Sequence, residues 1–280
     1  MSNVVKVWLG IAAGFVTVGL IVFVVVMTIS GWDFSIFETN KYETNTFELD
    51  EEFNSLLIDT SVADVECIPS EDGKCKVVCY ESAYAKHSVQ IIDGTLNIIE
   101  TKEKNWRNYI GISISSPKVT VYLPDTEYEQ ISIEVSTGDV ELSDINCDSF
   151  TLDGSTCDIS VNNITVAGDI DIKVSTGKID LTDVNCDNLK TKSSTGDVVM
   201  KNVISTGKFD IIASTGDIKF DKCDATEISV KVSTGDVKGS LLSGKDFIVD
   251  TSTGDILVPD STGGKCTINT STGDIKITIE

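Results

Sequence analysis

The chain has 280 residues, of which 41% are hydrophobic, and its formal net charge is −22 at pH 7. This length suits one large domain with an appendage, and the hydrophobic share can fill a sizeable core. The negative charge argues against nucleic acid, whose phosphates need a basic surface, and against docking on anionic lipid headgroups. We therefore expect no nucleic-acid partner, whereas an acidic surface suits solubility, cations or basic partners.

The N-terminal segment predicts a membrane anchor. Residues 7–29 contain no charge, and a helix rising about 1.5 Å per residue spans a ~30 Å hydrocarbon core over that length. Trp8 and Trp32 bracket the segment, where interfacial aromatic residues are expected. The alternatives are a cleaved signal peptide or a buried core helix, but the apolar run is long and no Ala-x-Ala site comes after it. With Lys6 ahead of it, the positive-inside rule predicts a single-pass plasma-membrane protein, with residues 1–6 cytoplasmic and the C-terminal domain extracellular.

Two segments lie between the expected anchor and the regular repeats. Residues 30–47 are polar and weakly patterned, and we expect them to form a juxtamembrane spacer. Residues 48–128 contain short alternating apolar runs separated by turn signals, which predict an N-terminal β module that could cap one end of the repeats. Asp93-Gly94 lies between two such runs and suits the primed turn of a hairpin. Residues 60–64 imitate the turns found later in the chain.

Evenly spaced tight-turn signals organise residues 129–280. They recur every 19 or 20 residues, and most read Ser-Thr-Gly-Asp, as in Ser136–Asp139. The flanking residues alternate in polarity, which is typical of half-buried strands. A period near 19 is too short for helical-pair repeats and suits one coil of a solenoid. The sequence thus predicts an all-β fold, a single-stranded parallel β-solenoid (β-helix) with about eight coils of 19–20 residues.

Glycine occupies the third position of nearly every turn. It supplies a positive φ, which a β-carbon would oppose by about 1–2 kcal/mol. The exception is Cys157. The predicted turn glycines are Gly138, Gly177, Gly196, Gly216, Gly235, Gly254 and Gly273.

Aspartate occupies the fourth position of most turns, so coils stacked about 4.8 Å apart would form a ladder of carboxylates. Neighbouring unit charges at this spacing repel by roughly 1 kcal/mol even in water. Each Asp could accept hydrogen bonds from turn amides and hydroxyls, or the ladder could hold calcium between coils. The first interpretation is favoured, because calcium repeats normally carry more Gly and Asp per turn. The calcium candidates are Asp197, Asp217, Asp236, Asp255 and Asp274, and no other cofactor is expected.

The eight cysteines all come after the apolar segment. Three of them occupy equivalent corners two coils apart, beyond the ~7 Å Cα separation that a disulfide tolerates. Cys67 and Cys75 could face each other across a turn and form one candidate disulfide, whereas free thiols are expected for most of the others. The chain has no CxxC pair, and His87 is its sole histidine. The supply of ligands therefore argues against a zinc site.

Signals of catalysis are weak, and we expect no enzyme and no catalytic residues. The sequence has no nucleophile elbow, P-loop or dinucleotide fingerprint. The loop at 102–109 is an aromatic and basic patch in an acidic chain; it could pack over the open end of the coils or contact a partner through Trp106, Arg107 and Tyr109. The last predicted strand ends with the chain itself, so its exposed edge allows end-on self-association.

Three stretches together resemble the bacterial putative-adhesin family of unknown function. Ile58–Val65 forms a strand with a Ser/Ala-Asp corner, Val121–Pro124 ends a strand in Leu-Pro, and Ile133–Val140 contains the first regular turn. The resemblance covers about residues 48–280. It implies a cell-surface β-solenoid, some relatives of which are associated with envelope-stress systems, and it supplies no catalytic residues.

The expected function is that of a membrane-anchored, non-enzymatic, adhesin-like or envelope-associated binding module. Its ligand would be a cell-wall, surface or envelope component that the sequence does not identify. One alternative is a partner or scaffold of an envelope-stress sensing system. The other is a carbohydrate-active β-helix enzyme, for which paired carboxylates on one sheet would be required.

Overall fold

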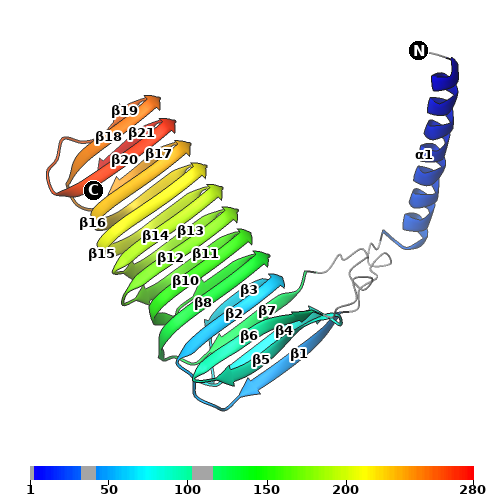
Figure 1. Cartoon of the computed structure of the whole chain (residues 1–280), viewed down its shortest axis with the longest axis horizontal. Coiled ribbons are helices and arrows are strands. Elements are labelled where there is room, and N and C mark those ends of the chain that lie inside the picture. Colours follow the sequence, from blue (N-terminus) through cyan, green and yellow to red (C-terminus); the bar gives the residue numbers. More distant parts are fainter. Residues whose placement is uncertain (1–2, 33–41, 103–115) are drawn as a thin grey trace. The chain divides into compact units, whose positions relative to one another are not determined.

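The structure is a computed structural model that describes residues 3–32, 42–102 and 116–280. The described residues form one helix, α1 (Asn3–Ile29), and a β unit that contains all of the strands (Figure 1). The helix and the β unit belong to separate compact units, so each is described by itself.

Helix α1 contains the apolar segment that the sequence singled out. Val5–Ile29 has a mean hydropathy of 2.7 and is long and apolar enough to cross a membrane, although an N-terminal signal sequence meets the same criteria. The helix begins at Asn3, earlier than the predicted residue 7. The hydroxyls of Thr17 and Thr28 donate to carbonyls one turn earlier, which leaves few unsatisfied polar groups along the helix.

The β unit consists of short strands joined by tight turns. In chain order these are β1 (Tyr42–Leu49), β2 (Ser55–Val62), β3 (Asp64–Pro69), β4 (Cys75–Ser82), β5 (Ala85–Ile92), β6 (Thr95–Lys102), β7 (Lys118–Leu123), β8 (Glu127–Thr137), β9 (Val140–Ser143), β10 (Asn146–Thr156), β11 (Ile159–Val166), β12 (Asp169–Thr176), β13 (Ile179–Cys186), β14 (Asn188–Thr195), β15 (Val198–Thr215), β16 (Ile218–Thr234), β17 (Val237–Leu241), β18 (Lys245–Thr253), β19 (Ile256–Leu257), β20 (Gly264–Thr272) and β21 (Ile275–Ile279).

Strand pairing runs along two faces of a stack of coils. One face has the order β5, β6, β2, β8, β10, β12, β14, the second halves of β15 and β16, then β20 and β18. The other has the order β1, β4, β7, β3, β9, β11, β13, the first halves of β15 and β16, then β17, β21 and β19. Pairings between coils are parallel, whereas β1, β4 and β5 pair antiparallel at the N-terminal end. The fold is therefore solenoid-like with a mixed sheet, in which the antiparallel pairings involve only β1, β4, β5, β6 and β7, mostly within the region where the sequence predicted a β module with a hairpin.

The core is filled by the inward-facing residues of both faces, as the alternating pattern predicted. Residues in register on successive coils form columns between the two sheets, and their side chains are almost entirely buried. Burial of each such aliphatic side chain contributes about 1.5–3 kcal/mol to stability. One column contains Ile133, Leu152, Ile172, Thr191, Ile211, Val230 and Ile268.

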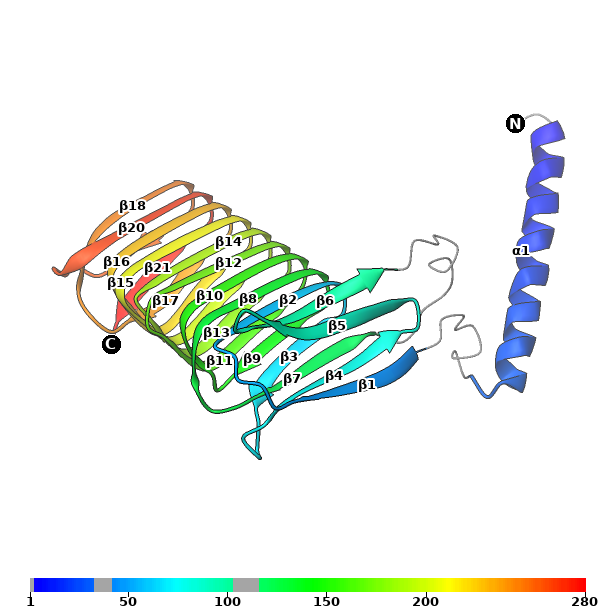
Figure 2. The ribbon, with the colours of Figure 1, turned by 60° about the horizontal axis from the view of Figure 1, so that its bottom comes forward.

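At the C-terminal end the coils do not stack in chain order. Ile228 pairs with Cys266, and Cys266 pairs in turn with Phe247, so β20 lies between β16 and β18. The chain therefore ends in the penultimate coil, and β18 with β19 forms the outermost one (Figure 1 and Figure 2). The prediction that the last strand forms the open end is wrong. Ile256 is 45% exposed there, although its neighbour in register, Ile275, is fully buried.

The N-terminal end has a matching exchange. Strand β2 pairs with β6 on one side and with β8 on the other. The coil of β2 and β3 therefore lies between β6 with β7 and the coil of β8 and β9, although β6 and β7 come later in the chain. The described residues of this region, 48–102 and 116–128, thus belong to the same stack and do not form a separate module that precedes it. The module also starts earlier, because β1 begins at Tyr42, inside the predicted spacer 30–47. The predicted hairpin at Asp93-Gly94 joins β5 and β6, and both of its residues have positive φ.

Candidate functional site

The repeated turns line one edge of the stack. All of the predicted turn glycines have a positive φ, between 133° and 149°. They are needed for a second reason, which the sequence did not reveal: each approaches the backbone of the preceding coil of the stack. A β-carbon on Gly216 would lie 2.1 Å from the carbonyl oxygen of Gly196. On its other side, the Gly216 amide donates to the Thr234 carbonyl of the following coil, at 3.0 Å.

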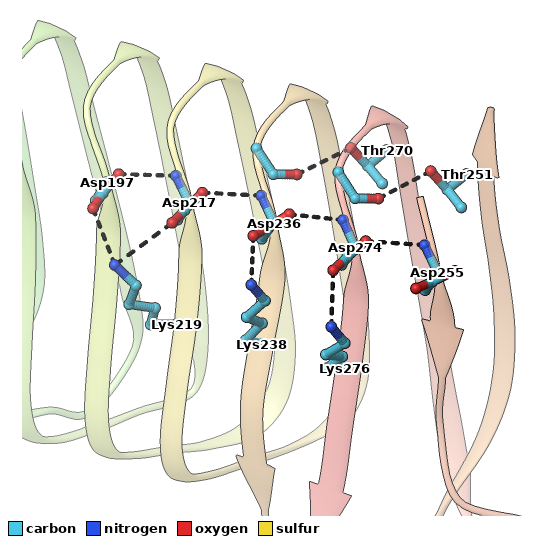
Figure 3. A network of polar contacts seen from close by, with 12 residues as sticks. Asp197, Asp217, Lys219, Asp236, Lys238, Thr251, Asp255, Thr270, Asp274 and Lys276 are labelled. Atoms are coloured by element: carbon cyan, nitrogen blue, oxygen red, sulfur yellow. Dashed lines mark hydrogen bonds and ion pairs between the residues drawn. The ribbon is translucent and has the colours of Figure 1, made fainter. Parts of the chain in front are cut away.

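The aspartates next to these glycines form a hydrogen-bonded ladder, part of which is drawn in Figure 3. The Oδ1 atom of each accepts from the backbone amide at the same position of the next coil. The distances are 2.9 Å from Asp217 N to Asp197, 3.0 Å from Asp236 N to Asp217, and 2.7 Å from Asp274 N to Asp236. The interpretation that turn amides satisfy the ladder is supported by these contacts.

Lysine side chains form ion pairs with several of the ladder carboxylates. Lys219 Nζ lies 3.2 Å from Asp197 Oδ2 and 3.7 Å from Asp217 Oδ2, so it bridges two coils. Lys238 pairs with Asp236 and Lys276 with Asp274, each from the strand that leaves the same turn. Amides and lysines together offset part of the carboxylate repulsion within this run of the ladder.

The order of the ladder matches the stack and not the chain. Asp274 lies between Asp236 and Asp255, because its amide donates to Asp236 and its carboxylate accepts from the Asp255 amide at 3.0 Å. At the other end Asp64 joins the ladder by accepting from the Asp139 amide at 3.0 Å. The sequence signal for Asp64 was its turn-like neighbourhood at residues 60–64. Lys178 donates its amide to Asp158 but has no carboxylate to accept the next one, so it separates the ladder into two runs.

These contacts hold several ladder carboxyl groups in their charged form. The amide of Asp217, assisted by Lys219, lowers the pKa of Asp197 below its ordinary value. Lys238, together with the Asp274 amide, lowers the pKa of Asp236. For Asp274 the leading cause of the lowered pKa is the Asp255 amide, and Lys276 adds to it. None of the three is therefore poised to act as a proton donor near neutral pH.

We expect the β unit to lose stability in acid through this ladder. A carboxyl whose pKa is lowered by folding stabilises the folded state above its ordinary pKa, near 4, and this contribution disappears as the pH falls through the folded value. The melting temperature should fall below about pH 4, and less steeply in Asp236→Asn, which keeps an amide acceptor but loses the charge. Thermal melts between pH 2 and pH 7 measure both curves. Parallel curves for parent and variant would contradict this role of the ladder.

A shallow groove of about 380 Å³ lies beside the N-terminal run of the ladder. Its charged lining has six carboxylates and only two lysines, Lys118 and Lys178. Each lysine is already paired, Lys118 with Glu66 at 2.9 Å and Lys178 with Asp180 at 2.6 Å. The groove therefore has an excess of negative charge on an accessible outer surface. Its acidic lining residues are Asp64, Glu66, Asp139, Glu141, Asp158 and Asp180.

The remaining predicted site residues are distributed differently. All eight cysteines are buried free thiols, so the candidate Cys67–Cys75 disulfide is not formed in the structure. Burial raises the pKa of all eight thiols, to about 12 for Cys67, and this keeps them protonated at neutral pH when no metal is bound. The expected contact patch at Trp106, Arg107 and Tyr109 lies outside the described residues.

Parallel registers, stacked turns and an amide-bonded aspartate edge define a repeat protein of the β-solenoid class. The Toastrack DUF4097 family matches residues 53–168 and again residues 165–280. The chain belongs to this family, and the resemblance to a putative-adhesin family is confirmed. Each match contains one end of the stack. At both ends two coils are exchanged relative to chain order: β2 lies between β6 and β8, and β20 lies between β16 and β18.

Comparison with solved structures gives further similarities. A putative adhesin from Bacteroides fragilis is 18% identical, with a TM-score of 0.50, over 85% of this chain and 97% of that one. A putative lipid binding protein from Parabacteroides distasonis is 13% identical, with a TM-score of 0.48, over 86% and 97% of the two chains. A putative adhesin from the same organism is 13% identical, with a TM-score of 0.44, over 86% and 98%. No curated protein matches the chain.

Proposed function

We propose that the protein is a membrane-anchored surface module that binds a basic or cation-rich partner in an adhesin-like way through the outer faces of its coils. In this proposal α1 is an uncleaved anchor with its N-terminus in the cytoplasm, and the β unit is extracellular. Family membership and a similar structure described as a putative adhesin favour a surface role. The parallel coils of 19–20 residues serve as a rigid display scaffold.

The observation that carries the proposal is the acidic groove beside the ladder. The interior of the described coils is filled with apolar side chains, so the outer surfaces are the parts on which a partner could bind. The groove concentrates six carboxylates against two lysines that are already paired. Clustered charge of one sign on an exposed surface attracts oppositely charged partners and raises their rate of association.

A non-enzymatic role is consistent with the same geometry. The ladder carboxylates accept backbone amides and lysines, and their lowered pKa values suit fixed charges better than general acids. Thiols that could act as nucleophiles are buried. We therefore favour a binding module over a carbohydrate-active enzyme as the function. Sugar turnover by the purified protein would instead favour the enzyme.

The test is cross-linking of the full-length protein in living cells, with identification of the attached molecules. A groove variant, Glu66→Gln with Glu141→Gln and Asp180→Asn, is compared with a control that neutralises the same number of outward carboxylates on the other face. That control is Glu134→Gln with Asp153→Asn and Asp210→Asn. Loss of capture in the groove variant alone supports the proposal, and equal capture by the parent and both variants overturns it.

The identity of the captured material separates the remaining hypotheses. Cell-wall polymer or foreign surface material supports an adhesin-like role. Membrane signalling proteins support a partner or scaffold of an envelope-stress system, and the word adhesin would then be dropped. A second copy of the chain, linked through β18 and β19, would indicate end-on self-association of the outermost coil.

A further inference from the structure

A buried polar cluster lies between the two faces at the N-terminal end of the stack. Cys79 and Glu81 come from β4 on one face, and His87 comes from β5 on the other. The side chains of His87 and Glu81 are only 2% and 1% exposed, and Cys79 is fully buried. This cluster interrupts a core that is otherwise largely apolar, and it contains the sole histidine of the chain.

The cluster is held in a fixed orientation. His87 Nδ1 lies 2.8 Å from Glu81 Oε2, and His87 Nε2 lies 3.0 Å from Thr60 Oγ1 on β2. The second oxygen of Glu81 accepts from the Asn45 side chain at 2.7 Å. The Thr60 hydroxyl lies in turn 3.4 Å from a carboxylate oxygen of Glu100 on β6. Such outer contacts fix the ring and the carboxylate, as they do around metal ligands in proteins.

We propose that Cys79, Glu81 and His87 form a binding site for a divalent transition metal of the zinc type, which would link the two faces of the stack. One ligand atom from each residue lies within 4.8 Å of the other two. Zinc takes thiolate sulfur at about 2.3 Å and imidazole or carboxylate atoms at about 2.0–2.2 Å. Binding therefore needs a local rearrangement, in which His87 Nδ1 and Glu81 Oε2 separate from 2.8 Å and the Cys79 sulfur completes the set. The sequence argued against zinc because these ligands have no spacing motif, but the hairpin of β4 and β5 brings them together.

The exchange of protons for metal balances the charge in this buried space. The metal binds His87 Nδ1 and Glu81 Oε2, and the single proton of the neutral ring moves from Nδ1 to Nε2, which donates it to Thr60 Oγ1 while the Thr60 hydroxyl turns towards Glu100. Cys79 binds as a thiolate, and its proton leaves to solvent. One thiolate and one carboxylate then neutralise the two positive charges of the ion, so no net charge is left in a low-dielectric site.

The mixture of ligands selects the class of metal. A thiolate and an imidazole disfavour calcium and magnesium, which prefer oxygen ligands, and they suit zinc or cobalt(II). Three protein ligands leave a fourth position of the tetrahedron for water. This site is distinct from the aspartate ladder, whose oxygen ligands would suit calcium.

The experiment is a cobalt(II) titration of the full-length protein in detergent after removal of bound metal by a chelator. Cobalt bound to a thiolate gives a near-ultraviolet charge-transfer band, and we expect saturation at one ion per chain, with displacement by zinc. Cys79→Ser and His87→Gln should abolish the band. Cys266→Ser, which removes a buried thiol far along the stack, should leave it unchanged.

Thr60→Val keeps all three ligands and removes only the partner of His87 Nε2. It should weaken binding by about 10–100-fold, the usual cost of losing an outer contact, and it stays informative if a ligand variant fails to fold. Absence of a band in the parent protein would overturn the proposal. A band that survives Cys79→Ser, or that is lost in Cys266→Ser, would overturn it as well.

Discussion

Replacing Gly196 by valine is expected to lower the melting temperature of the β unit by on the order of 10 °C. Gly196 has φ 137°, a region that costs a residue with a β-carbon about 1–2 kcal/mol. A β-carbon there would also lie 1.9 Å from the carbonyl oxygen of Gly177, which is backbone and cannot turn aside. The coils must separate locally, so the total loss should reach about 3–5 kcal/mol.

The matched control is Thr195→Val, which introduces the same side chain one residue earlier at an exposed position. It should shift the melting temperature by no more than the usual effect of a surface substitution, about 0.5 kcal/mol. Thermal unfolding monitored by circular dichroism measures all three proteins under one condition. Equal melting temperatures for Gly196→Val and the parent would show that the coils do not approach each other as described.

Replacing Lys245 by methionine is expected to cost about 3–5 kcal/mol of unfolding free energy, the range for breaking a buried ion pair. Lys245 is only 2% exposed, an unusual state for lysine. Its ammonium group meets Asp224 Oδ1 at 2.6 Å, the Ala225 carbonyl at 2.7 Å and Ser243 Oγ at 2.8 Å. Three donors thus meet three acceptors, and methionine of similar length would leave those acceptors without a partner.

Two further variants separate the buried pair from ordinary surface charge. Lys219→Met removes a lysine whose side chain is 48% exposed, and it should cost less than about 1 kcal/mol. Adding Asp224→Asn to Lys245→Met should recover part of the loss, because the uncompensated charge is gone. Denaturant unfolding measures the free energies. Equal losses for Lys245→Met and Lys219→Met would contradict the buried contact.

The class of fold could be predicted from the sequence because the residue pattern of each strand shows which of its two faces is buried. The alternation of Ile228, Val230 and Val232 with polar residues indicates a strand with one buried face. Glycine at a turn position such as Gly138 indicates a positive φ, whatever the order in which the coils stack. The aspartate ladder was predicted for the same reason, since a fixed period places like residues in register. The amides that satisfy it are implied by the stacking of turns.

The order of the coils could not be predicted, because the repeats are nearly equivalent. Val230 can pack beside Ile268 or Val249 with similar apolar contact, and periodicity does not favour either neighbour. The buried cluster at Glu81 and His87 was missed for a related reason. Its members come together through antiparallel pairing at the N-terminal end, where the repeat pattern no longer applies.

The ladder, the groove and the buried cluster all depend on how the coils stack, so the stacking order is the claim to test first. Ser229 on β16 lies in register with Thr267 on β20, although Ile248 on β18 comes earlier in the chain. We would introduce the pair Ser229→Cys with Thr267→Cys, and in a second protein Ser229→Cys with Ile248→Cys. The native thiols are buried and give little background.

A short thiol-specific cross-linker is then applied that spans one strand spacing, about 4.8 Å, but not two. The stacking described here predicts efficient cross-linking of the pair at 229 and 267 and little at 229 and 248. Efficient cross-linking at 229 and 248, with little at 229 and 267, would mean that the coils stack in chain order, and the inserted C-terminal coil would be wrong.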